Sequence, residues 1–183
     1  MFVESFPAGD MTQPGRVAMR AAIVNYLTAA NLPFVGEVLG TAPKITSENT
    51  FFVSVPAGTG TGAVIFVHLE RQRETLLSYP AVGGGWKERP FDVVLMCFLR
   101  SVERRTDAIQ LANDQMLDAL VHALEMDPNM GDTAVVYTQG LGRPPRYGPD
   151  IEVESDLPRP VLQGATEIFT TVRFVASEMV QAV

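Results

Sequence analysis

The chain has 183 residues, 46% of them hydrophobic, which suits one domain with a sizeable core and argues against disorder. Its formal net charge of −7 argues against a broad surface that grips nucleic acid, because such binding depends on Lys and Arg. The single cysteine, Cys97, excludes an internal disulfide and a multi-thiolate metal site.

The N-terminal half predicts one helix followed by strands. We expect residues 1–13 to form a loose arm and residues 14–183 a single domain. A helix should begin at Thr12 or Pro14 and end near Asn31, before the stop signal Pro33. Its predicted apolar face comprises Val17, Ala21, Ile23, Val24, Leu27 and Ala30.

Three strand candidates follow this helix. Residues 34–39 predict a short strand, and residues 50–55 and 63–70 predict two more, joined by a glycine-rich connection over 56–62. Residues 71–82 fit either a mobile loop or a short helix. The segment 91–99 is apolar at positions of both parities, so we expect a central strand with both faces covered.

The C-terminal half predicts a second helix and further strands. The helix spans 106–125, with Thr106 as its cap and Asp107 at the positive end of its dipole. Its predicted buried face comprises Ile109, Ala112, Met116, Leu117, Leu120 and Leu124. Residues 133–139 predict a strand, 140–150 a loop, 151–157 an acidic edge strand, and 167–178 a final strand.

This order predicts an α+β fold: a mainly antiparallel β-sheet with two α-helices packed on one face. The hairpin-length connections argue against βαβ crossovers. No run of about 18 apolar residues predicts a membrane span, and the first residues lack the basic and apolar segments of a secretion signal. We therefore expect a soluble protein made in a cytoplasm. The low charged share of 19% fits either burial against partners or a large monomeric core.

The residues that carry chemistry in other proteins lack their required context here. The glycine-rich segments 58–62 and 83–85 precede predicted strands, whereas phosphate loops lead into a helix and need a following Lys and Ser or Thr. His68 and His122 have no second ligand at a zinc spacing. Glu152, Glu154 and Asp156 alternate along a strand, without a calcium-binding loop. We expect no catalytic, metal or cofactor site, and hence no enzyme.

Two segments are candidate partner contacts. Trp86, the only tryptophan, lies beside three glycines and is followed by Lys87, and exposed Trp is enriched at interface hot spots. Arg143, Arg146 and Tyr147 lie in a loop stiffened by proline. An ordinary core tryptophan and an ordinary exposed loop are the alternatives.

The order of the elements resembles that of the tail terminator proteins of long-tailed bacteriophages. It comprises a helix with Arg16 and Arg20, a Gly-Lys element ending in Lys87, a strand ending at Arg100, a long helix closing at an Asp-Pro turn, and a final strand. The resemblance spans roughly residues 12–180. It implies a virion protein that forms a ring, expected to be a hexamer, where the tail meets the head.

The resemblance implies that such a ring ends tail-tube polymerisation and contacts the tail-tube protein and the head connector, or stopper, protein. DNA would pass through it without specific binding, and the acidic composition predicts an acidic or neutral channel wall. The candidate channel-facing residues are Glu70 and Glu74, although Arg71 and Arg73 beside them weaken the case. The alternative is that the acidic residues only keep the outside of the protein soluble. The alternatives are another virion ring protein, either a tail-tube subunit or a head-closure protein, and a small α+β enzyme or ligand-binding domain.

Overall fold

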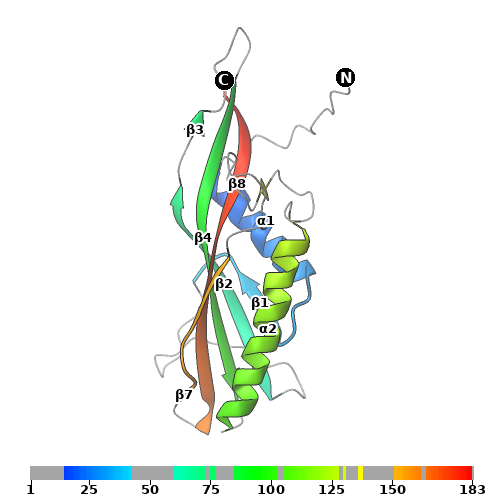
Figure 1. The fold of residues 1–183 in the computed structure, drawn as a ribbon, viewed down its shortest axis with the longest axis vertical. Helices are drawn as coiled ribbons and strands as arrows, with labels where there is room; N and C mark the ends of the chain where they lie inside the picture. The colour runs from blue at the N-terminus through cyan, green and yellow to red at the C-terminus, as the bar shows by residue number, and fades with distance from the viewer. Residues whose placement is uncertain are drawn as a thin grey trace.

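The computed structural model describes residues 15–42, 60–72, 75–76, 85–102, 105–127, 130, 136–137, 151–161 and 164–182. The molecule is elongated, and two long strands run along most of its length (Figure 1). The predicted arm over residues 1–13, the strand over 50–55 and the loop over 140–150 lie outside the described residues.

The described strands form one sheet in the order β1-β2-β4-β8-β5, in which β3 also pairs with β4, and β6 and β7 with β8. Their bounds are β1 Val35–Leu39, β2 Thr61–Gln72, β3 Thr75–Leu76, β4 Gly85–Ser101, β5 Val136–Tyr137, β6 Glu152–Ser155, β7 Arg159–Pro160 and β8 Thr166–Ala182. Every described pair is antiparallel except β1 with β2. The predicted α+β class is confirmed, and β1 with β2 is a parallel pair in a described sheet that is otherwise antiparallel.

β4 and β8 are the framework of the sheet because they pair over 17 residues each. β4 begins at Gly85, so Trp86 and Lys87 lie within the strand and do not precede it as predicted. Pro90 is tolerated inside this central strand, since β2 ends opposite Phe91 and β3 begins opposite Glu88. The missing N–H of proline therefore falls where no described strand pairs on that side. The predicted loop or helix over 71–82 was wrong where β2 and β3 continue the sheet.

Helix α1 (Arg16–Ala29) packs on β1 and β2. Its buried residues are Met19, Ala22, Ile23 and Leu27. Two members of the predicted face were wrong: Ala21 is exposed, and Val17 is 61% exposed. The true face is rotated because it is set by contact with the sheet, and the several small and apolar residues of this helix allow more than one stripe.

Helix α2 (Thr106–Met126) packs on β4 and β8, on the same side as α1. All six residues predicted for its apolar face are buried, as is Asn113. The predicted cap was wrong, since Arg105 occupies the N-cap and no side chain caps the helix. Asp107 lies in the first turn as expected, and its hydrogen bonds from Arg105 hold the pKa of its carboxyl below the usual value.

The two helices meet at their C-terminal ends. The Tyr26 hydroxyl donates a hydrogen bond of 2.5 Å to the carbonyl oxygen of Ala123. Burial, and then the negative charge of Asp127, raise the pKa of Tyr26. The tyrosine thus remains a neutral donor that ties α1 to the end of α2.

The main core lies between the helices and one face of the sheet. The strands contribute alternate residues, for example Ile65, Leu95 and Val172, which are each fully buried. No described helix packs on the opposite face, but Val94 of β4 is only 2% exposed there, so the prediction that both faces of β4 are covered stays a prediction. Its central position in the sheet is confirmed. We call the two sides the helix-covered face and the helix-free face.

Candidate interaction surfaces

The candidate contact residues that the structure describes do not lie in one place. Trp86 and Lys87 lie in the part of β4 that pairs with the end of β8, opposite Gln181 and Val180. Glu70 lies several residues away on β2, where it is exposed. The candidates Glu74, Arg143, Arg146 and Tyr147 lie outside the described residues.

Glu70 lies on the helix-free face, where a residue of β8 neutralises its negative charge. Its carboxylate lies 3.1 Å from the guanidinium of Arg173. Farther along the same strands, Glu167 lies 3.9 Å from the guanidinium groups of both Arg100 and Arg159. Arg173, Arg100 and Arg159 are therefore paired with carboxylates of the same chain.

The centre of the helix-free face is apolar. Phe98 of β4 and Phe169 of β8 are cross-strand partners with ring centroids 4.8 Å apart. Val64 of β2 lies opposite Phe98 in the next strand and is buried. Phe66 and Met96 form the neighbouring row and are half-buried. This face thus combines an apolar centre with paired charges at its ends.

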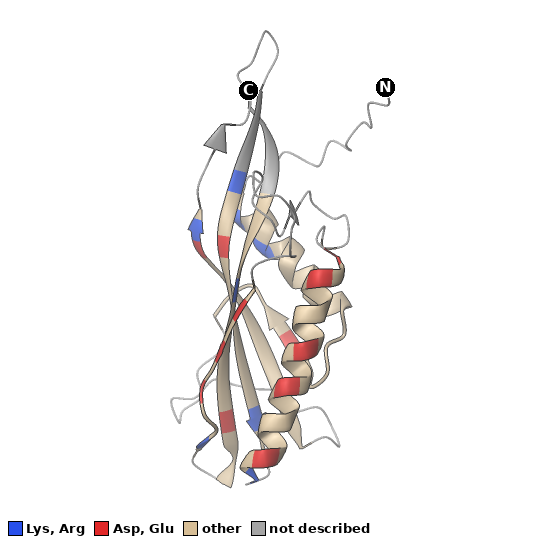
Figure 2. Ribbon diagram, in the orientation of Figure 1, with Lys and Arg blue, Asp and Glu red and all other residues tan. Residues whose placement is uncertain are grey.

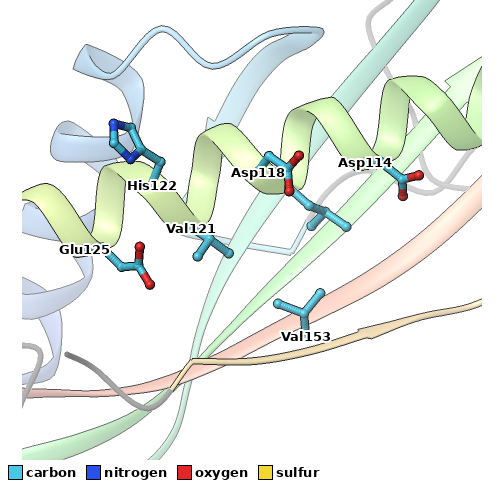
Figure 3. A pocket seen from close by; sticks show the side chains of 7 residues that line it. Asp114, Asp118, Val121, His122, Glu125 and Val153 are labelled. Carbon is cyan, nitrogen blue, oxygen red and sulfur yellow. The ribbon is translucent and has the colours of Figure 1, made fainter. Parts of the chain in front are cut away.

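A second surface is an open groove of about 360 Å³ between α2 and β6 (Figure 3). Leu117 and Val121 of α2 and Val153 of β6 supply its apolar side chains, and Val153 is 42% exposed. Asp114 and Asp118 contribute carboxylates at its rim. His122 and Glu125 line the end nearer the C-terminus of the helix.

A buried hydrogen-bond cluster fixes α2 relative to β6. Thr170 of β8 donates to the side-chain oxygen of Asn113, at 3.2 Å, and lies 2.9 Å from the hydroxyl of Ser155. Asn113 in turn donates to Ser155 at 3.5 Å. Thr170 is fully buried and Asn113 is 3% exposed, so these polar groups depend on one another. They place the groove beside the edge of the sheet.

The outer face of α2 is acidic, and Arg105 pairs with the acidic residue nearest the N-terminus of the helix, Asp107. The helix contains Asp107, Asp114, Asp118 and Glu125 but no Lys or Arg, and red segments recur along it in Figure 2. Asp114 and Asp118 are four residues apart, a spacing at which like charges destabilise a helix. Glu125 lies near the negative end of the helix dipole, where a cation would be favourable. Asp114, Asp118 and Glu125 therefore do not stabilise α2 itself.

The sequence prediction missed this groove. A signal was present in the lack of Lys and Arg over 106–126 and in the spacing of Asp114 and Asp118. The role of Val153 could not be anticipated, because only the pairing of β6 with β8 brings it beside α2.

The histidines and the cysteine occupy separate environments. His68 is half-buried on the helix-free face, its ring centroid 6.1 Å from that of Phe66, and His122 is exposed on α2. Cys97 is buried in the core, and this burial raises its thiol pKa to about 12. Among the described residues, no three His, Cys, Asp or Glu side chains are grouped as metal ligands.

Comparison with known proteins adds no relative. No protein-family model matches the chain, and the curated proteins contain no significant match. Within the part of the chain that the structure describes, no helix has the length and apolar character needed to cross a membrane.

Proposed function

We propose that this protein is a phage virion structural protein, a tail terminator. Six copies form a ring at the top of the tail tube, end tube polymerisation and join the tail to the head connector. The resemblance in element order supports this proposal, and the same order recurs in α1, β4, α2 and β8. Ring closure requires head-to-tail contacts between two different surfaces of the subunit.

The observation that carries the proposal is the pairing of arginines with carboxylates on the helix-free face. Arg173 is paired with Glu70, and Arg100 and Arg159 with Glu167. Glu152 and Glu154 are exposed on β6 and add negative charge beside Arg173 and Thr171, their partners on β8. Directed toward a channel, this face gives DNA few cations with which to replace its counterions, so DNA slides with little resistance.

The position of the protein in assembled particles tests the function directly. We expect ring density of about 120 kDa, six chains of 19.9 kDa, at the head–tail joint in reconstructions of the virion. Density for this chain elsewhere in the particle, or as isolated monomers, contradicts the proposal. Fibres formed by the pure protein would favour the tail-tube alternative, since a tube subunit stacks on itself without limit.

A charge reversal tests the channel wall. Glu70→Lys leaves Arg173 without its carboxylate and should slow DNA ejection from purified particles, by an amount that diminishes as salt is raised. Asp107→Lys is the matched control because it makes the same change of charge and likewise takes a carboxylate from an arginine, Arg105, at an exposed position on α2. Equal effects of the two variants would contradict a channel lined by the helix-free face.

A further inference from the structure

The groove beside α2 adjoins a strand edge that no described strand covers. β6 pairs with β8, and no other strand pairs with it within the described ranges. An uncovered edge offers unpaired N–H and C=O groups to an added strand. The edge and the groove therefore form one surface with main-chain and side-chain binding capacity.

The register of β6 shows which main-chain N–H and C=O groups face the uncovered edge. The N–H of Asp156 donates to the carbonyl of Phe169 on β8, at 2.8 Å. Because successive residues of an antiparallel strand turn their main-chain groups to alternate sides, Glu154 and Glu152 also face β8. Val153 and Ser155 then direct their N–H and C=O groups away from β8, toward the uncovered edge.

The two faces of β6 differ in chemistry. Val153 lines the groove and Ser155 bonds to Asn113 of α2, so these side chains are on the helix side. Glu152 and Glu154 alternate with them and lie on the helix-free side, where both are exposed. A strand added to this edge would place alternate side chains in the groove and opposite the two glutamates.

We propose that the β6 edge and the α2 groove bind an extended segment of a partner protein, whose side chains alternate between apolar residues and Lys or Arg. The apolar residues pack on Leu117, Val121 and Val153, and the basic residues lie opposite Glu152 and Glu154. Asp114 and Asp118 attract a cation at the rim of the groove. This is strand addition, in which main-chain hydrogen bonds supply affinity and alternate side chains supply specificity.

The negative charge of the groove favours a basic segment over an acidic or neutral one. The groove side presents Asp114, Asp118 and Glu125, and α2 contains no Lys or Arg to neutralise them. An acidic or neutral segment would leave these carboxylates uncompensated, whereas a basic one relieves the repulsion between Asp114 and Asp118. The inference goes beyond the ring function, since it holds whether or not the protein closes a ring.

The test uses the full chain and two synthetic heptapeptides. One alternates, Lys-Val-Lys-Val-Lys-Val-Lys, and the other has the same composition in blocks, Lys-Lys-Lys-Lys-Val-Val-Val. We expect saturable binding of the alternating peptide by titration calorimetry, and binding of the block peptide at least about tenfold weaker, because only alternation matches both faces of β6. Equal binding of the two peptides would show mere charge attraction, and no binding of either would also overturn the inference.

Two variants locate the binding. Val153→Pro removes an N–H that faces the uncovered edge, and proline is tolerated at such positions, so we expect at least about a tenfold loss of affinity for the alternating peptide. Val153→Ala keeps the N–H and is the control for the lost side chain, with a smaller loss. The double variant Asp114→Lys, Asp118→Lys changes only exposed residues, so it tests the groove even if Val153→Pro disturbs folding. It should lower the affinity for the alternating peptide by a similar factor. Unchanged affinity in this double variant would place the peptide elsewhere.

The alternative occupant is the same edge of a second copy. In that case, the wild-type protein would self-associate, Val153→Pro would abolish this self-association, and the alternating peptide would not bind. That result in sedimentation and calorimetry would overturn the assignment to a partner segment. It would leave the proposed function intact, since the position of the chain in the virion tests that separately.

Discussion

The two faces of the central sheet are built from the same three strands, yet they differ in composition and burial. On the helix-covered face, β2, β4 and β8 place fully buried apolar residues such as Ile65, Leu95 and Val172 against the helices. On the helix-free face, half-buried Phe98 and Phe169 are followed along the strands by ion pairs. One face is therefore a core that stabilises the chain, and the other combines partly exposed aromatic side chains with ion pairs.

The largest expected difference between the faces is chemical access to a thiol. Cys97 is buried on the helix-covered face, so a thiol reagent should modify it only through unfolded molecules, about a thousandfold or more slowly than a free thiol. Stopped labelling followed by mass spectrometry measures the rate. Met96→Cys in a Cys97→Ala background moves the thiol to the helix-free face and should react much faster. Similar rates for both proteins would show that the faces are equally covered.

A cavity in the core should have the largest effect on stability. Leu120→Ala removes a fully buried side chain between α2 and the sheet and should lower the free energy of unfolding by about 2–5 kcal/mol. Met96→Ala, on the helix-free face, should cost only about 1 kcal/mol because that side chain is only partly buried to begin with. Denaturation by urea measures both variants.

Leu111→Ala is the control for Leu120→Ala, because it makes the same substitution in α2 at an exposed position. Its side chain is 59% exposed on the outer face of α2, so its effect should remain within about 0.5 kcal/mol. A loss of more than about 2 kcal/mol in Met96→Ala would mean that the helix-free face is packed as tightly as the core.

Two neighbouring threonines of β8 allow the polar groups on the two faces to be compared. Thr170→Val removes a buried hydroxyl from the cluster with Asn113 and Ser155, and should cost about 1–3 kcal/mol because Asn113 loses a partner. Thr171→Val makes the same chemical change one residue later, on the opposite face, and should change the unfolding free energy by less than about 0.5 kcal/mol. Equal losses in thermal denaturation would contradict the alternation of β8.

The smallest expected effect is the ion pair between Glu70 and Arg173. Both side chains are about half exposed, so a double-mutant cycle with Glu70→Gln and Arg173→Gln should give a coupling of about 0.2–1 kcal/mol. The coupling should decline as salt rises toward about 1 M, because exposed charges are screened. A coupling that salt does not alter would indicate that this pair is shielded from water.

Local sequence patterns predicted the long elements well. The apolar spacing of α2 identified all six predicted core residues, because a 21-residue helix with one clear stripe leaves little choice of face. α1 was predicted less well, since its many small and apolar residues permit several stripes and its contact with β2 selects one. The extra length of β4 and β8 was not visible either, because Gly85, Pro90 and the polar residues near them are poor strand formers in isolation.

The candidate contact residues also show what the sequence could predict and what only the structure decided. The sequence drew attention to Trp86 and Lys87 by their unusual composition, and the structure places them in β4 without joining them to Glu70. The function and the ring remain proposals. The groove was not predicted, since α2 and Val153 are brought together only by the pairing of β6 with β8.

The sequence by itself determined the fold class, the core face of α2 and the acidic character of the chain, because each depends on residue type and short-range spacing. The tertiary structure alone decided which residues of α1 are buried, how far the central strands extend and which carboxylates meet arginines. Those outcomes depend on contacts between residues far apart in the sequence, such as Glu70 with Arg173, whose geometry no local pattern encodes.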